Sequence, residues 1–222
     1  MNYLALCQRT ARECGVSGTG PTTVLSQVGE LSRIVTWVAT ALEDIETAHP
    51  DWQWMKREMS FVTVAGQAEY TTLQCGITAG TFGTWERYRF RNYPTAVGNI
   101  GEIEMGWTSY DEWRDSYSYG ATRYVQTRPM DAAMTPDQGL ALGPYPAAGY
   151  TITGQYYRAP QILAADSDLP EMDTNYHMGI VYKAMMHYGM YESATEVVER
   201  GQEEFQKVMN RMNAKRMPEV TW

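Results

Sequence analysis

The 222-residue sequence has few cysteines and no long hydrophobic run. No apolar stretch approaches the roughly 20 residues that a membrane-spanning helix needs. The first residues, MNYLALCQRTAREC, have neither a basic leader nor a small-residue cleavage site, so we expect no signal peptide. The three cysteines are Cys7, Cys14 and Cys75. On a helix the first two would lie about 10 Å apart, too far for a disulfide, which suits a reducing compartment.

Motifs for catalysis and cofactor binding are also missing. There is no phosphate-binding loop, dinucleotide fingerprint, nucleophile elbow or zinc-protease helix. His49, His177 and His187 are not spaced as metal ligands, and no two cysteines are close enough in sequence for a zinc site. The many carboxylates show no spacing that singles out a general acid and a general base. We therefore predict a protein that is not an enzyme, with no catalytic residue, cofactor or metal ion.

Positive charge is scarce, because 18 Lys and Arg stand against 26 Asp and Glu, for a formal charge of −8. Such an acidic chain is unsuited to wrapping nucleic acid through phosphate neutralisation. It could line a passage for DNA, since like charges repel. The sequence contains 16 Tyr, 7 Trp and 14 Met. These residue types are enriched at protein interfaces, although a core that uses them is the alternative.

Hydrophobic periodicity predicts helices at both ends of the chain. Apolar side chains recur every three to four positions in residues 2–14, 29–48, 174–192 and 193–216. Asp173 is placed to cap the third of these helices. Because each helix has one apolar face, we expect the four to pack together as one helical bundle.

The middle of the chain predicts a β-rich domain. Short strand patterns separated by turn residues run from about Arg57 to Pro160, and one helix interrupts them at a capping-box pattern that begins at Thr108 or Ser109. The predicted fold is α+β, a helical bundle formed by the N- and C-terminal helices with an inserted β-rich domain. We assign the bundle to residues 1–56 and 161–215, the insert to 57–160 and a C-terminal tail to 216–222.

Two tryptophans, Trp52 and Trp54, lie at the predicted junction of bundle and insert. Pro50 ends the second helix, and an extended chain after it would point both indoles to the same side. We interpret the pair as an apolar wedge between the helical layer and the sheet layer. A ligand clamp and a partner-facing pair are the alternatives.

Arg87, Arg89 and Arg91 form the only basic stripe, within the alternating sequence WERYRFRNY. With Tyr88 and Phe90 in the core, the arginines would form the solvent face of an antiparallel strand. The alternatives are a surface for an acidic protein partner and a grip on a nucleic-acid backbone.

The densest acidic segment is DSDLPEMD, residues 166–173. It lacks the glycine and the closing glutamate of an EF-hand loop, and Pro170 interrupts it. We expect a solvated linker that also caps the next helix, with an ordered cation site as the alternative.

Several stretches resemble the head-to-tail connector proteins of tailed bacteriophages, also called adaptors: RECGVSG, AHPDWQWM, LGPYP, YTITGQYYRAP and LPEMDTNYHMGIVYKAMMHYGMYE. The resemblance extends over nearly the whole chain and is weakest in residues 72–106. It implies a helical bundle with a β-rich insertion, the same order that the patterns predict. It also implies a structural virion protein of the neck, made in the host cytoplasm.

The resemblance further implies partners. Such adaptors form a ring of typically about 12 subunits beneath the portal, and a C-terminal segment often reaches into a groove on the portal. That segment corresponds here to Arg216, Met217, Pro218, Val220 and Trp222. The implied partners are other copies of the chain, the portal protein and a tail or nozzle protein. DNA would pass through the channel without specific binding.

An alternative function is a ligand- or carbohydrate-binding β module. Trp85, Trp107, Trp113 and the tyrosines would then serve as stacking surfaces at the mouth of a pocket. This function requires several of these rings to be exposed together in one concave patch.

Overall fold

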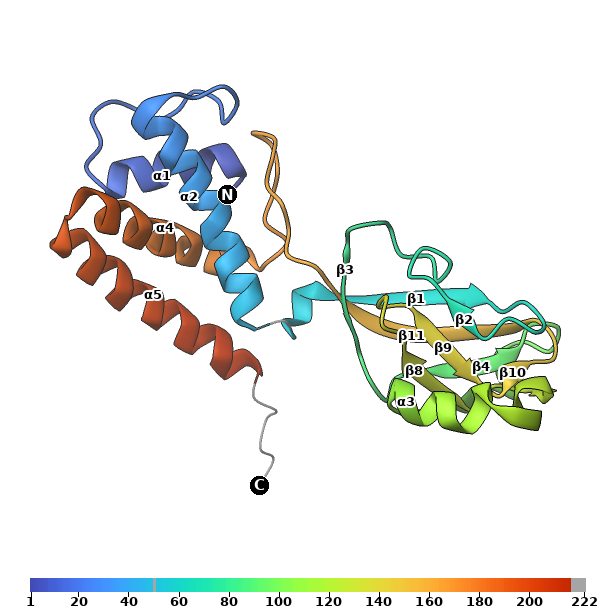
Figure 1. Ribbon diagram of the computed structural model, residues 1–222. Coiled ribbons are helices and arrows are strands. Elements are labelled where there is room, and N and C mark those ends of the chain that lie inside the picture. Colours follow the sequence, from blue (N-terminus) through green and yellow to red (C-terminus); the bar gives the residue numbers. More distant parts are fainter. Residues whose placement is uncertain (50, 217–222) are drawn as a thin grey trace. The chain divides into compact units, whose positions relative to one another are not determined.

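The computed structural model describes residues 1–49 and 51–216 (Figure 1). The described chain divides into two compact units. One is helical and comprises residues 1–49 and 160–216; the other is β-rich and comprises residues 51–159. Helices from both ends of the chain pack against one another, with the sheets inserted between them in sequence. The predicted α+β fold is therefore confirmed.

The helical unit is organised around one central helix. In the described residues its α-helices are α1 (Tyr3–Glu13), α2 (Gly29–Ala48), α4 (His177–Glu192) and α5 (Thr195–Arg216), with a 3-10 turn, Thr174–Tyr176, before α4. Helix α4 packs against α1, α2 and α5. The apolar stripes that the sequence predicts supply many of the buried side chains, among them Cys7, Ala11, Ile34, Val38, Leu42, Ile180, Val181, Ala184, Met185, Val208 and Met212.

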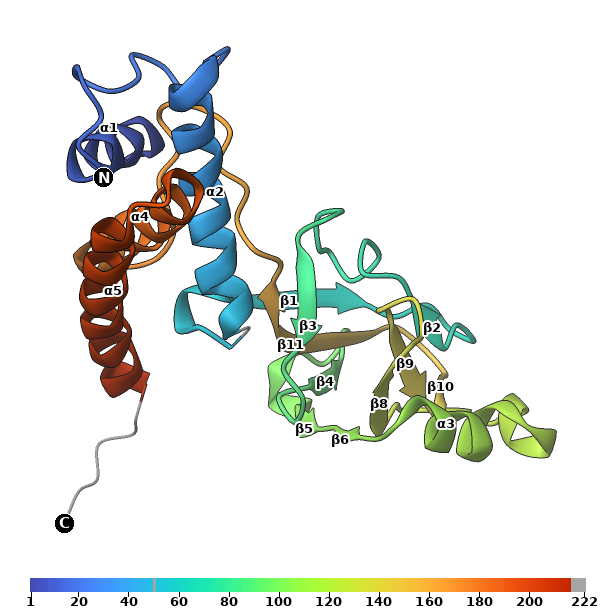
Figure 2. The ribbon, with the colours of Figure 1, turned by 60° about the vertical axis from the view of Figure 1, so that its left-hand side comes forward.

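Glycines allow α4 and α5 to approach closely, and the two helices lie side by side in Figures 1 and 2. A Cβ atom at Gly189 would lie 2.7 Å from Val198 Cγ2 and 3.0 Å from the carbonyl oxygen of Ala194. A Cβ at Gly201 would lie 3.0 Å from the carbonyl oxygen of Tyr182. These positions therefore have no room for a larger side chain without a shift of one helix.

The acidic segment at residues 166–173 is bonded into the helical unit. The Asp166 carboxylate accepts hydrogen bonds from the Val24 N–H (2.6 Å) and the Thr23 hydroxyl (3.1 Å). The prediction of a solvated linker is wrong for this residue, because its carboxylate satisfies donors of the loop between α1 and α2. Asp173 does cap the next helical turn as predicted, since its side chain accepts from the Asn175 N–H at 3.0 Å.

The β unit contains two main sheets (Figure 2). The first has the strand order β1 (Lys56–Val62), β11 (Tyr150–Arg158), β4 (Arg91–Pro94) and β5 (Ile103–Glu104), with β3 (Phe82–Trp85) also paired to β11. The second has the order β2 (Glu69–Tyr70), β9 (Leu140–Gly143), β8 (Asp131–Met134) and β6 (Gly106–Trp107). A short parallel pair joins β7 (Gln126–Thr127) to β10 (Tyr145–Pro146).

The core of the β unit lies between these sheets, as in a sandwich. Phe61 and Ile152 come from the first sheet, and Leu140 and Leu142 from the second. Aromatic rings also contribute to this core, where Trp85 and Phe90 pack edge-to-face with centroids 5.6 Å apart.

Helix α3 (Tyr110–Trp113) packs against β8 and β9. Ser109 and Glu112 form the predicted capping box. A π-helical turn, Arg114–Ser118, and a 3-10 turn, Gly120–Tyr124, continue the segment. The sequence TRYVQTRP, residues 122–129, has a strand pattern, but only the two residues of β7 form a strand there, so this prediction is mostly wrong. Side-chain bonds to local carbonyls, such as that from the Thr122 hydroxyl to the Tyr119 oxygen at 2.6 Å, favour the turn.

Trp52 and Trp54 lie at the start of the β unit. Trp52 precedes a 3-10 turn, Gln53–Met55, and Trp54 lies within it, so the continuous extended chain predicted for the pair is wrong. Trp52 is 1% exposed. Its ring stacks on that of Trp54 with centroids 4.5 Å apart and planes at 15°. The two indoles therefore pack on each other, and their role as a wedge stays a prediction.

All three cysteines are free. Burial raises the pKa of Cys7 and of Cys75 to about 12, so both thiols are poor nucleophiles at neutral pH. Among the helices described, none combines the length and the apolar character needed to cross a bilayer.

Candidate partner-binding surface

The outer face of the first sheet is polar. Along β1, Met59 and Phe61 point into the core, whereas Lys56, Glu58 and Ser60 lie on the opposite face. In the register of the sheet, Glu58 pairs with Gln155 and Ser60 pairs with Thr153. This face was not predicted, although the alternation of polar and apolar residues in KREMS and in TITGQYY indicates it.

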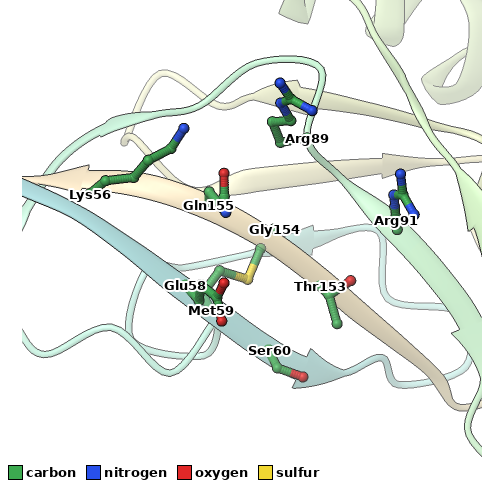
Figure 3. A pocket seen from close by; sticks show the side chains of 9 residues that line it. All are labelled: Lys56, Glu58, Met59, Ser60, Arg89, Arg91, Thr153, Gly154 and Gln155. Atoms are coloured by element: carbon green, nitrogen blue, oxygen red, sulfur yellow. The ribbon is translucent and has the colours of Figure 1, made fainter. Parts of the chain in front are cut away.

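A hollow of about 690 Å³ lies on this face (Figure 3). Figure 3 shows β11 in the middle, with Glu58 and Ser60 of β1 on one side of it and Arg89 and Arg91 on the other. The lining is mostly polar and consists of Lys56, Glu58, Met59, Ser60, Arg89, Arg91, Thr153, Gly154 and Gln155. Two of the three predicted arginines are thus brought together with residues that are distant in sequence.

The predicted arginine strand is interrupted by a turn. Trp85 pairs with Tyr156 and Arg91 pairs with Thr153, both on β11. Six positions separate Trp85 from Arg91 (91 − 85), but only three separate their partners (156 − 153), so three residues loop out. We call residues 87–89 the arginine turn.

The turn has a physical reason. In a continuous strand, Trp85 and Phe90 would point to opposite faces, because five positions separate them and the side-chain period is two. The extra residues let both rings reach the core. Phe90 is buried as predicted, but Tyr88 is not, since its φ is +68° and it is 67% exposed. The prediction that Tyr88 lies in the core is wrong.

The cations of this surface differ in their pairing. Lys56 pairs with Glu86 at 3.1 Å, and Arg91 pairs with Glu102 at 3.1 Å. Arg87 and Arg89 are exposed, and within residues 1–49 and 51–216 neither forms an ion pair. The arginine turn therefore presents two positive charges that lie outside any ion pair of the described residues.

Glu86 is held as a carboxylate by its surroundings. Partial burial opposes its ionisation, but hydrogen bonds from Tyr157 and Lys56 and the nearby charges of Lys56 and Arg89 outweigh it and lower the pKa of Glu86. The base of the turn therefore carries a fixed negative charge next to the two free arginines.

A buried polar clamp fixes strand β4. The Arg128 guanidinium donates to the Asn92 side-chain oxygen at 2.6 Å and to the Asn92 backbone oxygen at 2.7 Å. The Asn92 side-chain N–H donates to the Pro129 oxygen at 2.7 Å. Asn92 is fully buried and adjoins Arg91, so the clamp positions one edge of the hollow.

Arg128→Met is expected to lower the free energy of unfolding of the β unit by roughly 1–3 kcal/mol, because it leaves buried acceptors of Asn92 unpaired. Urea unfolding followed by tryptophan fluorescence measures the change. The matched control is Arg87→Met, which removes an exposed arginine outside any described ion pair and should shift stability by less than about 0.5 kcal/mol. Equal unfolding midpoints for the two variants would contradict the role of the clamp.

The tryptophans named for carbohydrate stacking do not form an open patch. Trp85 and Trp113 are buried. Trp107 is half-buried and stacks on Phe90 with centroids 5.3 Å apart. The exposed concave set of rings that this alternative function requires is therefore absent at these three positions.

Metal binding has little support in the described residues, where no group of three or more His, Cys, Asp and Glu side chains is placed to hold an ion. His177 is buried against the Met172 oxygen at 3.1 Å, and His187 contacts Asp44 at 3.1 Å. Both contacts are structural.

The predicted portal-binding tail lies almost entirely outside the described residues. Arg216 is the last residue of α5, and Met217, Pro218, Val220 and Trp222 follow it. Their assignment to partner binding stays a prediction.

The sequence matches the family described as SU10 adaptor protein over residues 1–221. This range includes the residues of both units, so the similarity is not confined to the helices or to the insert. No curated protein matches the sequence.

Proposed function

The chain belongs to the SU10 adaptor protein family, a phage head-to-tail adaptor family, and on this premise we propose that it forms a ring joining the portal to the tail of a tailed phage. Membership implies a virion location and portal and tail partners. The family is structural, which implies a protein without enzymatic activity. The ring, of about 12 copies by analogy with such adaptors, is the proposed step.

The match over residues 1–221 carries this proposal. The surface chemistry supports it, because a ring needs two different patches that meet from one copy to the next. The arginine turn is one candidate patch, with free arginines around an exposed tyrosine. Arg and Tyr are the residue types that contribute most to protein interfaces.

The proposed ring would form part of the DNA channel. Each copy carries a formal charge of −8. Like charge along a channel wall repels the phosphate backbone, so DNA would pass without specific binding.

The tail at residues 216–222 is proposed to bind the portal. Its apolar members, Met217, Val220 and Trp222, could anchor a segment that becomes ordered on binding. Arg216 and Pro218 complete the proposed segment.

The test is to size the purified protein by light scattering, alone and after addition of its portal. We expect either a ring in solution or a monomer that assembles on the portal. Removing residues 216–222 should abolish capture by the portal and leave the circular dichroism spectrum unchanged. Trp222→Ala, a single change within the same segment, should weaken capture at least about tenfold, as the loss of an interface anchor does.

A folded protein that neither forms rings nor joins the portal would contradict the proposal. Capture that is unaffected by the truncation would remove the tail from the portal interface and leave the ring itself standing.

A further inference from the structure

The arginine turn has the features of a surface that binds a partner outside its own unit. Tyr88 has a left-handed backbone, which is unfavourable for a bulky side chain. Its ring is nevertheless largely exposed, so the β unit gains little packing from the strained position. Arg87 and Arg89 flank the ring, are exposed and form no ion pair among the described residues. A strained aromatic between two exposed cations that form no ion pair fits an acidic partner surface that also offers apolar contact.

Helix α5 carries a surface of this kind. Glu196, Glu199 and Glu203 are exposed, and their spacing of three and four places them on one face of the helix. Glu203 pairs with Lys207 at 2.8 Å, whereas Glu196 and Glu199 form no ion pair in the part of the chain that the structure describes. We call these three residues the acidic face.

A hollow adjoins the acidic face. It measures about 480 Å³ and is lined by Glu199, Gln202, Glu203, Gln206, Lys207 and Asn210. Its walls include the aliphatic stems of long side chains, against which an aromatic ring can pack. The acidic face therefore offers two features that suit the arginine turn, carboxylates outside any described ion pair and apolar contact.

We propose that the arginine turn of one subunit docks on the acidic face of the neighbouring copy. Arg87 and Arg89 pair with Glu196 and Glu199, and the Tyr88 ring lies in the adjoining hollow. The two patches differ, so the contact is heterologous and repeats around a closed ring. The inference rests on the proposed ring and names the surfaces that hold it together.

DNA fits the arginine turn less well than the acidic face does. Glu86 and Glu102 lie at its base, where they pair with Lys56 and Arg91. Glu58 lines the hollow of the β unit that Arg89 also lines. These carboxylates repel a phosphate backbone. The acidic face, in contrast, can contact the tip of the turn without contacting these carboxylates.

Charge reversal on each patch tests the contact. The first variant is Arg87→Glu with Arg89→Glu, and the second is Glu196→Arg with Glu199→Arg. Each alone should weaken self-association at least about tenfold, because like charges then face one another. Mixed in equal amounts, the two should assemble as well as the wild type, since every junction in an alternating ring again joins opposite charges. Analytical ultracentrifugation measures assembly, in solution or on the portal.

The matched control for the first variant is Arg12→Glu with Arg123→Glu, which makes the same change in net charge as that variant at two exposed arginines elsewhere. It should assemble like the wild type. Failure of the mixture to recover assembly, with wild type and control still forming rings, overturns the contact and leaves the proposed function standing. Loss of DNA retention or of tail-protein binding in the first variant, with assembly intact, also overturns it. A wild type that neither self-associates nor joins the portal overturns the proposed function itself.

Discussion

Gly189→Val is expected to destabilise the helical unit by roughly 3 kcal/mol or more. The new Cβ would lie 2.7 Å from a Val198 methyl and 3.0 Å from both the Val198 nitrogen and the Ala194 oxygen. Two of these three atoms belong to the backbone, so a side-chain rotation cannot relieve the contact. Helix α5 would have to move away from α4 and expose the apolar residues between them. Thermal unfolding followed by far-ultraviolet circular dichroism measures the loss.

Met190→Val is the matched control for this prediction. It introduces the same β-branched residue one position along the same helix, at a side chain that is 61% exposed. Its effect should stay below about 1 kcal/mol, the size of a helix-propensity change. Similar melting temperatures for the two variants would mean that the α4–α5 contact tolerates expansion, contrary to the close approach at Gly189.

Trp113→Ala is expected to cost the β unit about 3–5 kcal/mol, the usual effect of removing a large buried aromatic. Trp113 is 1% exposed. Its ring is stacked between those of Tyr110, with centroids 5.7 Å apart, and Tyr145, at 6.5 Å. The substitution leaves a cavity between α3 and the second sheet. Calorimetry and near-ultraviolet circular dichroism should both show a lower transition temperature.

Tyr124→Ala controls for the loss of an aromatic ring in the same segment. Tyr124 is 79% exposed, so its removal should change stability by less than about 0.5 kcal/mol. The comparison also addresses the carbohydrate-binding alternative, which needs Trp113 as an open stacking surface. A Trp113→Ala protein that keeps its stability and loses glycan binding would contradict the structural role assigned here.

The helical unit could be predicted because its helices follow one local rule. Apolar residues at intervals of three and four mark the buried stripe, and the predicted stripe of α2 contains Ile34, Val38 and Leu42, all of which are buried. Buried Glu46 on the same helix was not predicted. Its carboxylate accepts the backbone N–H of Gln161 at 2.6 Å, a contact across 115 positions that no local pattern contains.

The β unit was harder to predict, because the alternation of side chains between the two faces of a strand is interrupted at each irregularity. Alternation predicted that Tyr88 shares the core face with Phe90. The three extra residues between β3 and β4 changed the side to which each residue points. The number of extra residues depends on which positions of β11 pair with β3 and with β4. This register is fixed by pairing between segments that are distant in sequence.

The candidate site could be predicted only in part, because it too depends on pairing between segments that are distant in sequence. The three arginines stood out because they occupy alternate positions within five residues, 87–91. Their neighbours Glu58 and Gln155 did not, because register alone brings β1 and β11 together. The distinction between paired Arg91 and the unpaired arginines of the turn also depends on Glu102, which lies beyond β4 in sequence.

The register of β1 and β11 has an evolutionary consequence. Lys56 and Tyr157, near the points where the chain enters and leaves the insert, are cross-strand partners, and such Cα atoms lie about 5 Å apart. A segment whose ends nearly touch can be exchanged, lengthened or deleted by recombination with little change in the chain around it. The helices from the two ends of the polypeptide can thus persist as a constant platform. Phages that encounter different partners can then diversify by swapping the module between Lys56 and Tyr157.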